Sequence, residues 1–177
     1  MKLNLWRVTN LSYEVLEATN FLDKEKSQFI KDYMTSVKFP WLYSNCSTKI
    51  GDGNSMFSNV LYSNNQENKY YSAVCKDLIK HISPSEIVRI KANLTTNVDT
   101  YRNVFDYHTD FENIKNGMTS IYYVNTNNGG TVFENGKFVK SEQNKLVTFP
   151  MNLKHKTIPH TDNNYERIVI NINYIRD

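Results

Sequence analysis

Cysteine is scarce in this chain, and long apolar runs are missing. The 177 residues include two cysteines, Cys46 and Cys75, which are too few for a disulfide framework and lack the spacing of a metal finger. No apolar stretch is long enough to span a membrane. Charge at Lys2 and Arg7 interrupts the N-terminal segment before any apolar run typical of a signal peptide. We therefore expect a cytoplasmic protein, in a reducing compartment, with no membrane partner.

A strong charge of one sign is also missing. The 21 Lys and Arg residues barely outnumber the 18 Asp and Glu residues, which gives a formal net charge of +3. The basic residues are scattered rather than clustered, and this argues against nucleic acid as a partner. Asn, Lys, Ile and Tyr are frequent, which fits an AT-rich coding genome of a phage or a bacterium.

Internal repeats, low-complexity tracts and long linkers are absent from the sequence as well. A chain of 177 residues is long enough for one domain with a real core and too short for two comfortable ones. A hydrophobic content of 40% is typical of a globular protein. We expect a single domain over residues 1–177, in an oligomeric state that the sequence does not indicate.

Hydrophobic periodicity divides this domain into two parts. In residues 1–86, apolar residues recur at three- and four-residue steps over Leu22–Val37 and Tyr70–Ile82, which predicts two amphipathic helices. Loops around a short strand at 56–62 are expected between them. In residues 87–177, short segments rich in β-forming residues alternate with turn signals. The expected strands are 87–94, 119–125, 130–134, 137–140, 145–149, 156–160 and 166–175.

Many short strands at this spacing are typical of a sandwich or a jelly roll rather than a parallel α/β sheet. Asn135-Gly136 predicts a type I′ hairpin turn between two of them. We therefore expect a mainly β (α+β) fold, a jelly roll whose outer face is supported by the N-terminal helices.

A histidine and a carboxylate stand one residue apart at His108 and Asp110. On an extended chain, residues i and i+2 point to the same side, so both side chains can bind one ion. A second histidine from a distant strand would give two imidazoles and one carboxylate, which occupy one face of an octahedral Fe(II) ion and leave the other face open. Because a single His-x-Asp triplet often arises by chance, a surface role for His108 is the alternative.

Two histidines, His155 and His160, compete for the third position after Phe149-Pro150. They are five residues apart, so an extended strand would send their rings to opposite faces. We expect His155, at the entrance of the strand, to bind the metal, and His160 to lie at the surface or at the rim of the substrate site. His81, at the end of a predicted helix, is expected to be solvated and without a role.

Arg167 opens the last predicted strand, which is otherwise dominated by apolar residues. Alternation places Arg167, Asn171 and Asn173 on one face of this strand. That polar face suits a cavity that admits an acidic ligand, with the guanidinium binding a carboxylate through two hydrogen bonds. An ordinary surface arginine is the alternative.

Taken together, the residues from Tyr101 to Tyr174 resemble the catalytic core of the Fe(II)- and 2-oxoglutarate-dependent dioxygenases. The resemblance is closest to the prolyl-4-hydroxylase-like branch, with its small phage and bacterial members. The segments that carry it, in order along the chain, are His108-Thr109-Asp110-Phe111, Thr119-Ser120-Ile121-Tyr122-Tyr123-Val124-Asn125, Gly129-Gly130-Thr131-Val132-Phe133, Phe149-Pro150 with His155, and Arg167-Ile168-Val169-Ile170-Asn171-Ile172-Asn173.

This resemblance implies a double-stranded β-helix in which His108, Asp110 and His155 hold the iron. It implies that Arg167 binds the distal carboxylate of 2-oxoglutarate and that Tyr123 donates its hydroxyl to the same carboxylate. Plain core packing is the alternative for Tyr123. Asn171, on the same face as Arg167, is a further candidate for the cosubstrate site. Related halogenases lack the carboxylate ligand so that chloride can bind iron, and the presence of Asp110 therefore favours hydroxylation.

The activity implied by the resemblance is hydroxylation of a peptide, prolyl or amino-acid side chain, with release of succinate and CO2. Fe(II), 2-oxoglutarate and O2 would be required, with ascorbate as a possible reductant. Two alternatives are a dioxygenase that oxidises or demethylates a nucleobase, which the unclustered charge disfavours, and a non-catalytic metal-binding jelly-roll module. The aromatic segments Phe39–Tyr43 and Tyr70-Tyr71 are expected either in the core, which we favour, or in a wall facing the substrate.

Overall fold

The computed structural model describes residues 14–46, 54–97 and 105–177. The N-terminal residues on which the expectation about a signal peptide rests lie outside these ranges, as does Tyr101, the first residue of the resemblance. Within the described residues, none of the helices combines the length and the apolar character that crossing a bilayer requires.

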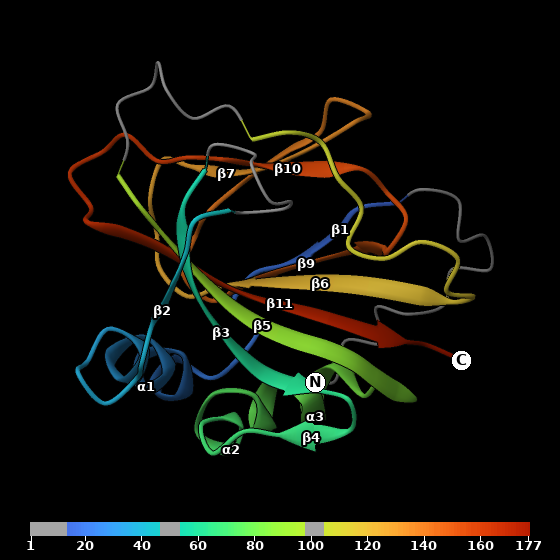
Figure 1. Ribbon diagram of the computed structural model, residues 1–177, viewed down its shortest axis with the longest axis horizontal. Helices are drawn as coiled ribbons and strands as arrows, with labels where there is room; N and C mark the ends of the chain where they lie inside the picture. Colours follow the sequence, from blue (N-terminus) through green and yellow to red (C-terminus); the bar gives the residue numbers. More distant parts are fainter. Residues whose placement is uncertain (1–13, 47–53, 98–104) are drawn as a thin grey trace.

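Two antiparallel sheets form the body of the protein (Figure 1). The large sheet has the strand order β1-β9-β6-β11-β5-β3-β2, with β4 paired to β3, and the small sheet has the order β10-β7-β8. The strands are β1 Leu16–Ala18, β2 Leu42–Ser44, β3 Met56–Ser63, β4 Gln66–Glu67, β5 Glu86–Thr96, β6 Gly117–Tyr123, β7 Gly130–Phe133, β8 Phe138–Lys140, β9 Lys145–Pro150, β10 His155–Ile158 and β11 Glu166–Ile175. The predicted jelly roll of mainly β character is confirmed.

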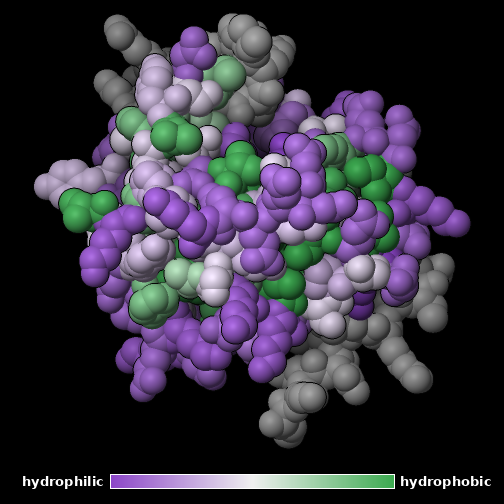
Figure 2. All heavy atoms as spheres, turned by 60° about the horizontal axis from the view of Figure 1, so that its bottom comes forward, coloured by the Kyte–Doolittle hydropathy of each residue, from purple (hydrophilic) through white to green (hydrophobic). Residues whose placement is uncertain are grey.

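Three helices, α1 Lys24–Met34, α2 Tyr71–Val74 and α3 Lys76–Ile82, lie on the side of the large sheet away from the small sheet (Figure 1). Hydrophilic side chains cover most of this face of the molecule, and hydrophobic ones interrupt them in separate groups (Figure 2). The helix expected over residues 70–82 is present as α2 and α3, which meet at Cys75. The short strands β1, β2 and β4 were not predicted, because two or three residues carry too little periodicity.

Each face of the large sheet packs into its own apolar core. Ile168, Ile170 and Ile172 of β11 belong to the cluster that the helices cover, which also contains Met34 and Leu78. The alternate residue Val169 belongs to a second cluster between the sheets, together with Ile121, Tyr123, Val147, Phe133 and Phe149. The alternation predicted for β11 is therefore confirmed, and its polar residues lie on the inner face.

The hairpin between β7 and β8 is present, but its predicted turn type is wrong. A type I′ turn needs positive φ at both central residues. Among the residues described, Gly136 has a φ of 84°, whereas Asn135 is not among the residues with positive φ. The Gly136 amide donates to the Phe133 carbonyl at 2.9 Å, and the Phe133 amide donates to Lys137 at 2.9 Å. This pattern is the longer hairpin loop in which glycine supplies the left-handed residue.

Candidate metal centre and the cavity beside it

His108 and His155 face each other across an isolated antiparallel bridge at the edge of the small sheet. The amide of each residue donates to the carbonyl of the other at 3.0 Å. In such a pair the side chains leave the backbone on the same side. The two imidazole rings accordingly lie 4.7 Å apart between centroids.

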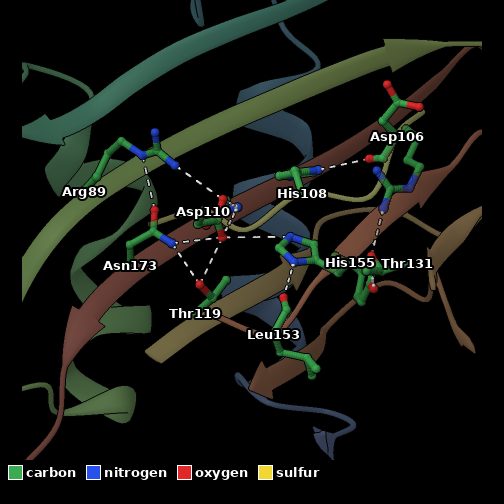
Figure 3. Close-up of polar contacts among 12 residues, drawn as sticks. Arg89, Asp106, His108, Asp110, Thr119, Thr131, Leu153, His155 and Asn173 are labelled. Carbon is green, nitrogen blue, oxygen red and sulfur yellow. Dashed lines mark hydrogen bonds and ion pairs between the residues drawn. The ribbon is translucent and has the colours of Figure 1, made fainter. Parts of the chain in front are cut away.

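Asp110, two residues after His108, completes the group. The Asp110 Oδ2 atom lies 3.9 Å from His155 Nε2, and both side chains are about 95% buried, with 5% and 4% of their surface exposed. One potential ligand atom from each of His108, Asp110 and His155 lies within 4.8 Å of the others. The structure therefore brings together the three predicted metal ligands (Figure 3).

Both imidazoles are oriented by backbone carbonyl groups. The Nδ1 atom of His155 lies 3.1 Å from the carbonyl of Leu153, and the Nδ1 atom of His108 lies 3.3 Å from that of Asp106. A proton on Nδ1 that is donated to a carbonyl leaves the Nε2 lone pair available, as in many metal-binding histidines. Burial lowers the pKa of His155, more than Asp110 raises it, and this favours the neutral ring that a metal requires.

The Asp110 carboxylate accepts hydrogen bonds from three neighbours on the large sheet. Asn171 Nδ2 donates to both of its oxygens at 3.2 Å, Asn173 Nδ2 donates at 3.1 Å, and Thr119 Oγ1 donates at 3.0 Å. The Arg89 guanidinium adds an ion pair at 3.4 Å. Burial by itself raises the pKa of Asp110, but His155, Arg89 and the hydrogen bond from Asn171 together hold it below its usual value.

Two imidazoles and one carboxylate are a donor set that suits Fe(II) and leaves coordination positions open. His155 belongs to β10 of the small sheet and His108 is bridged to it, whereas Asp110 lies in the following bend and is held by residues of β5, β6 and β11 in the large sheet. The residues present therefore fit an iron ion. Their geometry is that of a candidate metal centre at the mouth of the jelly roll.

A cavity extends from the two histidines toward Arg167. It is lined by Met56, Asn93, Thr95, Phe105, His108, Ile121, Thr131, His155, Thr157, Arg167, Val169 and Asn171. The Arg167 residue is 3% exposed. Its Nε donates to Ser141 Oγ at 3.0 Å, and its Nη2 donates to the Gly130 carbonyl at 3.1 Å.

The charge of Arg167 is unbalanced. No ion pair between Arg167 and a carboxylate is present among the described residues. Burial lowers the pKa of the guanidinium, while neighbouring Tyr123 raises it, and an arginine side chain stays charged in proteins. A buried charge without a counter-charge is costly. Arg167 is therefore suited to an anionic ligand that enters the cavity, and it is not the surface arginine of the alternative interpretation.

Tyr123 and Asn171 lie differently from each other. The fully buried Tyr123 donates its hydroxyl to Thr131 Oγ1 at 2.8 Å, and its ring lies 5.7 Å from Arg167 Cζ. Tyr123 does not line the cavity itself but contacts Thr131 and Arg167, which do, and its donation to a carboxylate stays a prediction. Asn171 lines the cavity at the metal end, where its amide nitrogen holds Asp110. A role for Asn171 in binding the cosubstrate also stays a prediction.

The expectation for His160 is wrong. The residue is 0% exposed, and it is not among the residues that line the cavity. The strand ends at Ile158, so its alternation does not extend to His160. The following turn folds back onto Asn128, which accepts from the Thr161 amide at 2.8 Å and whose own amide donates to Asp162 at 2.8 Å. His81 is exposed, as expected.

The aromatic segments belong mainly to the core on the helix side. Phe39 and Tyr71 are buried there, and Trp41 and Tyr70 pack against them. Tyr43 is 66% exposed. None of these residues lines the cavity, so the interpretation as core that we favoured fits the structure.

Several residues of the site were missed, above all those on β5. Arg89, Asn93 and Thr95 stand on its inner face, whereas Ile90 and Ala92 belong to the core on the other face. The same alternation of polar and apolar residues that identified β11 was available in this stretch. A strand was predicted there but no site residue, because no charged residue in the stretch stands alone as Arg167 does.

No family model matches the chain, and no curated protein matches it in sequence. Solved structures do share its fold. The prolyl-4-hydroxylase of Pseudomonas putida is 12% identical, with 93% of this chain and 94% of that chain covered, at a TM-score of 0.60. An oxidoreductase of the 2OG-Fe(II) oxygenase family from Burkholderia pseudomallei is 13% identical, with 93% and 85% covered, at a TM-score of 0.62.

A third neighbour is a non-heme alpha-ketoglutarate-dependent epimerase of nogalamycin biosynthesis, at 9% identity, with 92% of this chain and 77% of that chain covered and a TM-score of 0.64. The chain therefore has the fold of the 2OG-Fe(II) oxygenases. Prolyl-4-hydroxylases, the expected branch, are among its structural neighbours.

Proposed function

We propose that this protein is an Fe(II)- and 2-oxoglutarate-dependent dioxygenase. It hydroxylates a peptide or an amino-acid side chain and releases succinate and CO2. One observation carries the proposal, which is the convergence of His108, Asp110 and His155 at one end of a cavity whose other end holds the unpaired charge of Arg167. A purely structural metal site would have no need of that buried cation.

Each residue then has a defined task. His108, Asp110 and His155 hold the iron, which supplies activation of O2 when it is bound. Arg167 binds the distal carboxylate of 2-oxoglutarate. The rings of Phe149 and Phe133, whose centroids lie 4.7 Å and 6.2 Å from that of His155, exclude water from the buried side of the metal centre. Binding, orientation and exclusion of water are the contributions that a protein makes to cofactor chemistry.

The test is succinate formation by the purified protein with Fe(II), ascorbate and 2-oxoglutarate in the absence of a substrate. Slow uncoupled turnover is expected, and Asp110→Ala should abolish it. Asp77→Ala is the matched control, because Asp77 pairs with Lys26 on the helix side of the large sheet. Turnover that survives Asp110→Ala would remove Asp110 from the metal site. A protein that binds Mn(II) but forms no succinate would be the non-catalytic module instead.

A further inference from the structure

Unpartnered buried polar atoms gather around the cavity. Among the described residues five buried side-chain atoms have no hydrogen-bond partner, and three of them belong to Asn93, Thr95 and Asn171, which all line the cavity. The remaining two belong to Asn127 and His160, which do not. Because nearly all buried polar groups in folded proteins are paired, this grouping indicates a ligand that supplies the missing partners.

The orientation of Asn171 decides what kind of partner is missing. Its Nδ2 donates to both oxygens of Asp110 at 3.2 Å. Because an ionised carboxylate only accepts hydrogen bonds, the amide must present its nitrogen to Asp110. The Oδ1 atom is thereby fixed on the other side of the amide, where it is buried and unpartnered. An amide oxygen only accepts, so the ligand must donate an N–H or an O–H.

Asn93 extends this acceptor site onto the neighbouring strand. In the register of β5 and β11, Lys91 stands opposite Asn171 and Asn93 stands opposite Val169. Asn93 is therefore the diagonal neighbour of Asn171 on the inner face, within reach of one ligand group. Its Oδ1 atom is buried without a partner as well.

The cosubstrate cannot satisfy these atoms. In its ionised keto form 2-oxoglutarate carries only acceptor oxygens, and its distal carboxylate is assigned to Arg167 in the proposed function. The hydroxyl of Thr95, opposite Arg167 in the register, can donate or accept and is compatible with either ligand. The amide oxygens of Asn93 and Asn171 are left for the molecule that is oxidised.

We propose that Asn93 and Asn171 form a substrate subsite that accepts hydrogen bonds from a carboxamide or peptide N–H close to the oxidised carbon. This inference rests on the proposed function and names the substrate class of the same site. A substrate that lacks the donor would leave both oxygens buried and unpaired. The succinate formation that it stimulates should therefore be about ten- to hundredfold lower. The subsite therefore discriminates amides from esters of the same shape.

The experiment measures succinate formation with matched pairs of probes. One member of each pair is the N-acetyl N′-methylamide of a standard amino acid, and the other is the O-acetyl methyl ester of the corresponding 2-hydroxy acid, in which oxygen replaces each amide nitrogen. We expect at least one amide to stimulate succinate formation strongly and its ester to stimulate it about ten- to hundredfold less. If an ester stimulates succinate formation as strongly as its amide, the subsite is overturned. It is also overturned if none of the amides stimulates succinate formation.

Asn93→Leu is the decisive variant, because no hydrogen bond links Asn93 to Asp110 or Arg167 among the described residues. It should lose the preference for the amide while Mn(II) affinity stays that of the parent protein. Asn93→Ala serves if the leucine variant does not fold, and Thr157→Val is the control on the wall formed by β10. A preference that persists in the variants at position 93 contradicts the assignment.

Two further results distinguish a failure of the subsite from a failure of the proposed function. A crystal structure with Mn(II) and 2-oxoglutarate should show the cosubstrate at Arg167 and not on the side chain of Asn93. A direct contact between 2-oxoglutarate and Asn93 would give this position to the cosubstrate and overturn the subsite. A parent protein that neither binds Mn(II) nor forms succinate would overturn the proposed function itself, and the subsite with it.

Discussion

Arg167 and Asp110 are buried charges of opposite sign that do not neutralise each other. Asp110 is held by Arg89 and by polar side chains at the metal end of the cavity, whereas Arg167 at the other end contacts neutral oxygens and the ring of Tyr123. The inner face of one strand, β11, thus carries both the buried cation and the two asparagines that hold the Asp110 carboxylate. Because the two charges lie at opposite ends of the cavity, a substitution at either end tests one role without changing the other.

Arg167→Ala should raise the requirement for 2-oxoglutarate. Removal of the guanidinium deletes the charge assigned to the distal carboxylate and leaves the three metal ligands untouched. The 2-oxoglutarate concentration for half-maximal succinate formation should rise about ten- to hundredfold, with Mn(II) affinity unchanged. Arg167→Lys keeps the charge but not the planar guanidinium, so its half-maximal 2-oxoglutarate concentration should lie between those of the parent and of Arg167→Ala. Equal cosubstrate demand in variant and parent would refute the anchor.

The hydrogen bonds that orient Asp110 should strengthen metal binding. Thr119→Val and Asn173→Leu each remove a donor at 3.0–3.1 Å from the carboxylate, and each should weaken metal affinity about ten- to hundredfold. Thr119→Ser keeps the hydroxyl and should restore the affinity. The measurement is an anaerobic Mn(II) titration followed by electron paramagnetic resonance. Parental affinity in both variants would show that the carboxylate needs no support from the large sheet.

Hydrophobic periodicity predicted the helices and strands whose formation depends on local sequence. The helix expected over Leu22–Val37, which is present as α1 Lys24–Met34, and the strand alternation of β11 follow from the positions of apolar residues. The pairing of β5 with β11, which brings Asn93 beside the cavity, joins residues distant in the sequence and leaves no local signal. The burial of His160 was missed for the same reason, because Asn128 covers the turn after it from another part of the chain.

The small sheet depends on a close approach between β7 and β8. A Cβ atom at Gly130 would lie 2.3 Å from the Val139 carbonyl, whereas one at Gly136 would meet nothing within 4 Å. Gly130→Ala must move backbone and should lower the free energy of unfolding by about 1–3 kcal/mol. Gly136→Asn, the control, should cost less, because asparagine tolerates positive φ. Urea denaturation of the two variants compares them, and equal losses would contradict the close packing.

At the scale of the whole molecule, one tyrosine links the helix layer to the sheets. Tyr122 is fully buried on β6, and its hydroxyl lies 3.1 Å from Ser27 Oγ of α1 and 3.2 Å from Asn144 Oδ1. Asn144 in turn accepts from the Leu22 amide and donates to the Leu22 carbonyl, both at 2.8 Å. The start of α1 is thereby fixed to the sheet whose other face carries the candidate metal centre.

The ionisation of Tyr122 provides a test of this link. Burial raises the pKa of Tyr122 from its ordinary value of 10.0 to about 12, so the folded state favours the neutral phenol. Stability should therefore be unaffected by this group below about pH 10, where the unfolded chain begins to ionise, and should fall as pH rises toward 12. The loss from this group amounts to about 2 kcal/mol at pH 12.

Tyr122→Phe separates this effect from general alkaline unfolding. The variant loses the contacts to Ser27 and Asn144 and should be less stable at neutral pH by about 1 kcal/mol. Its stability should nevertheless decline less steeply than that of the parent between pH 10 and 12, because the ionising group is gone. Burial also raises the pKa of Tyr71 to about 12. The variant therefore retains the part of the decline that Tyr71 causes. Urea denaturation at a series of pH values measures both slopes, and parallel curves would show that the hydroxyl of Tyr122 is solvated rather than enclosed between α1 and the large sheet.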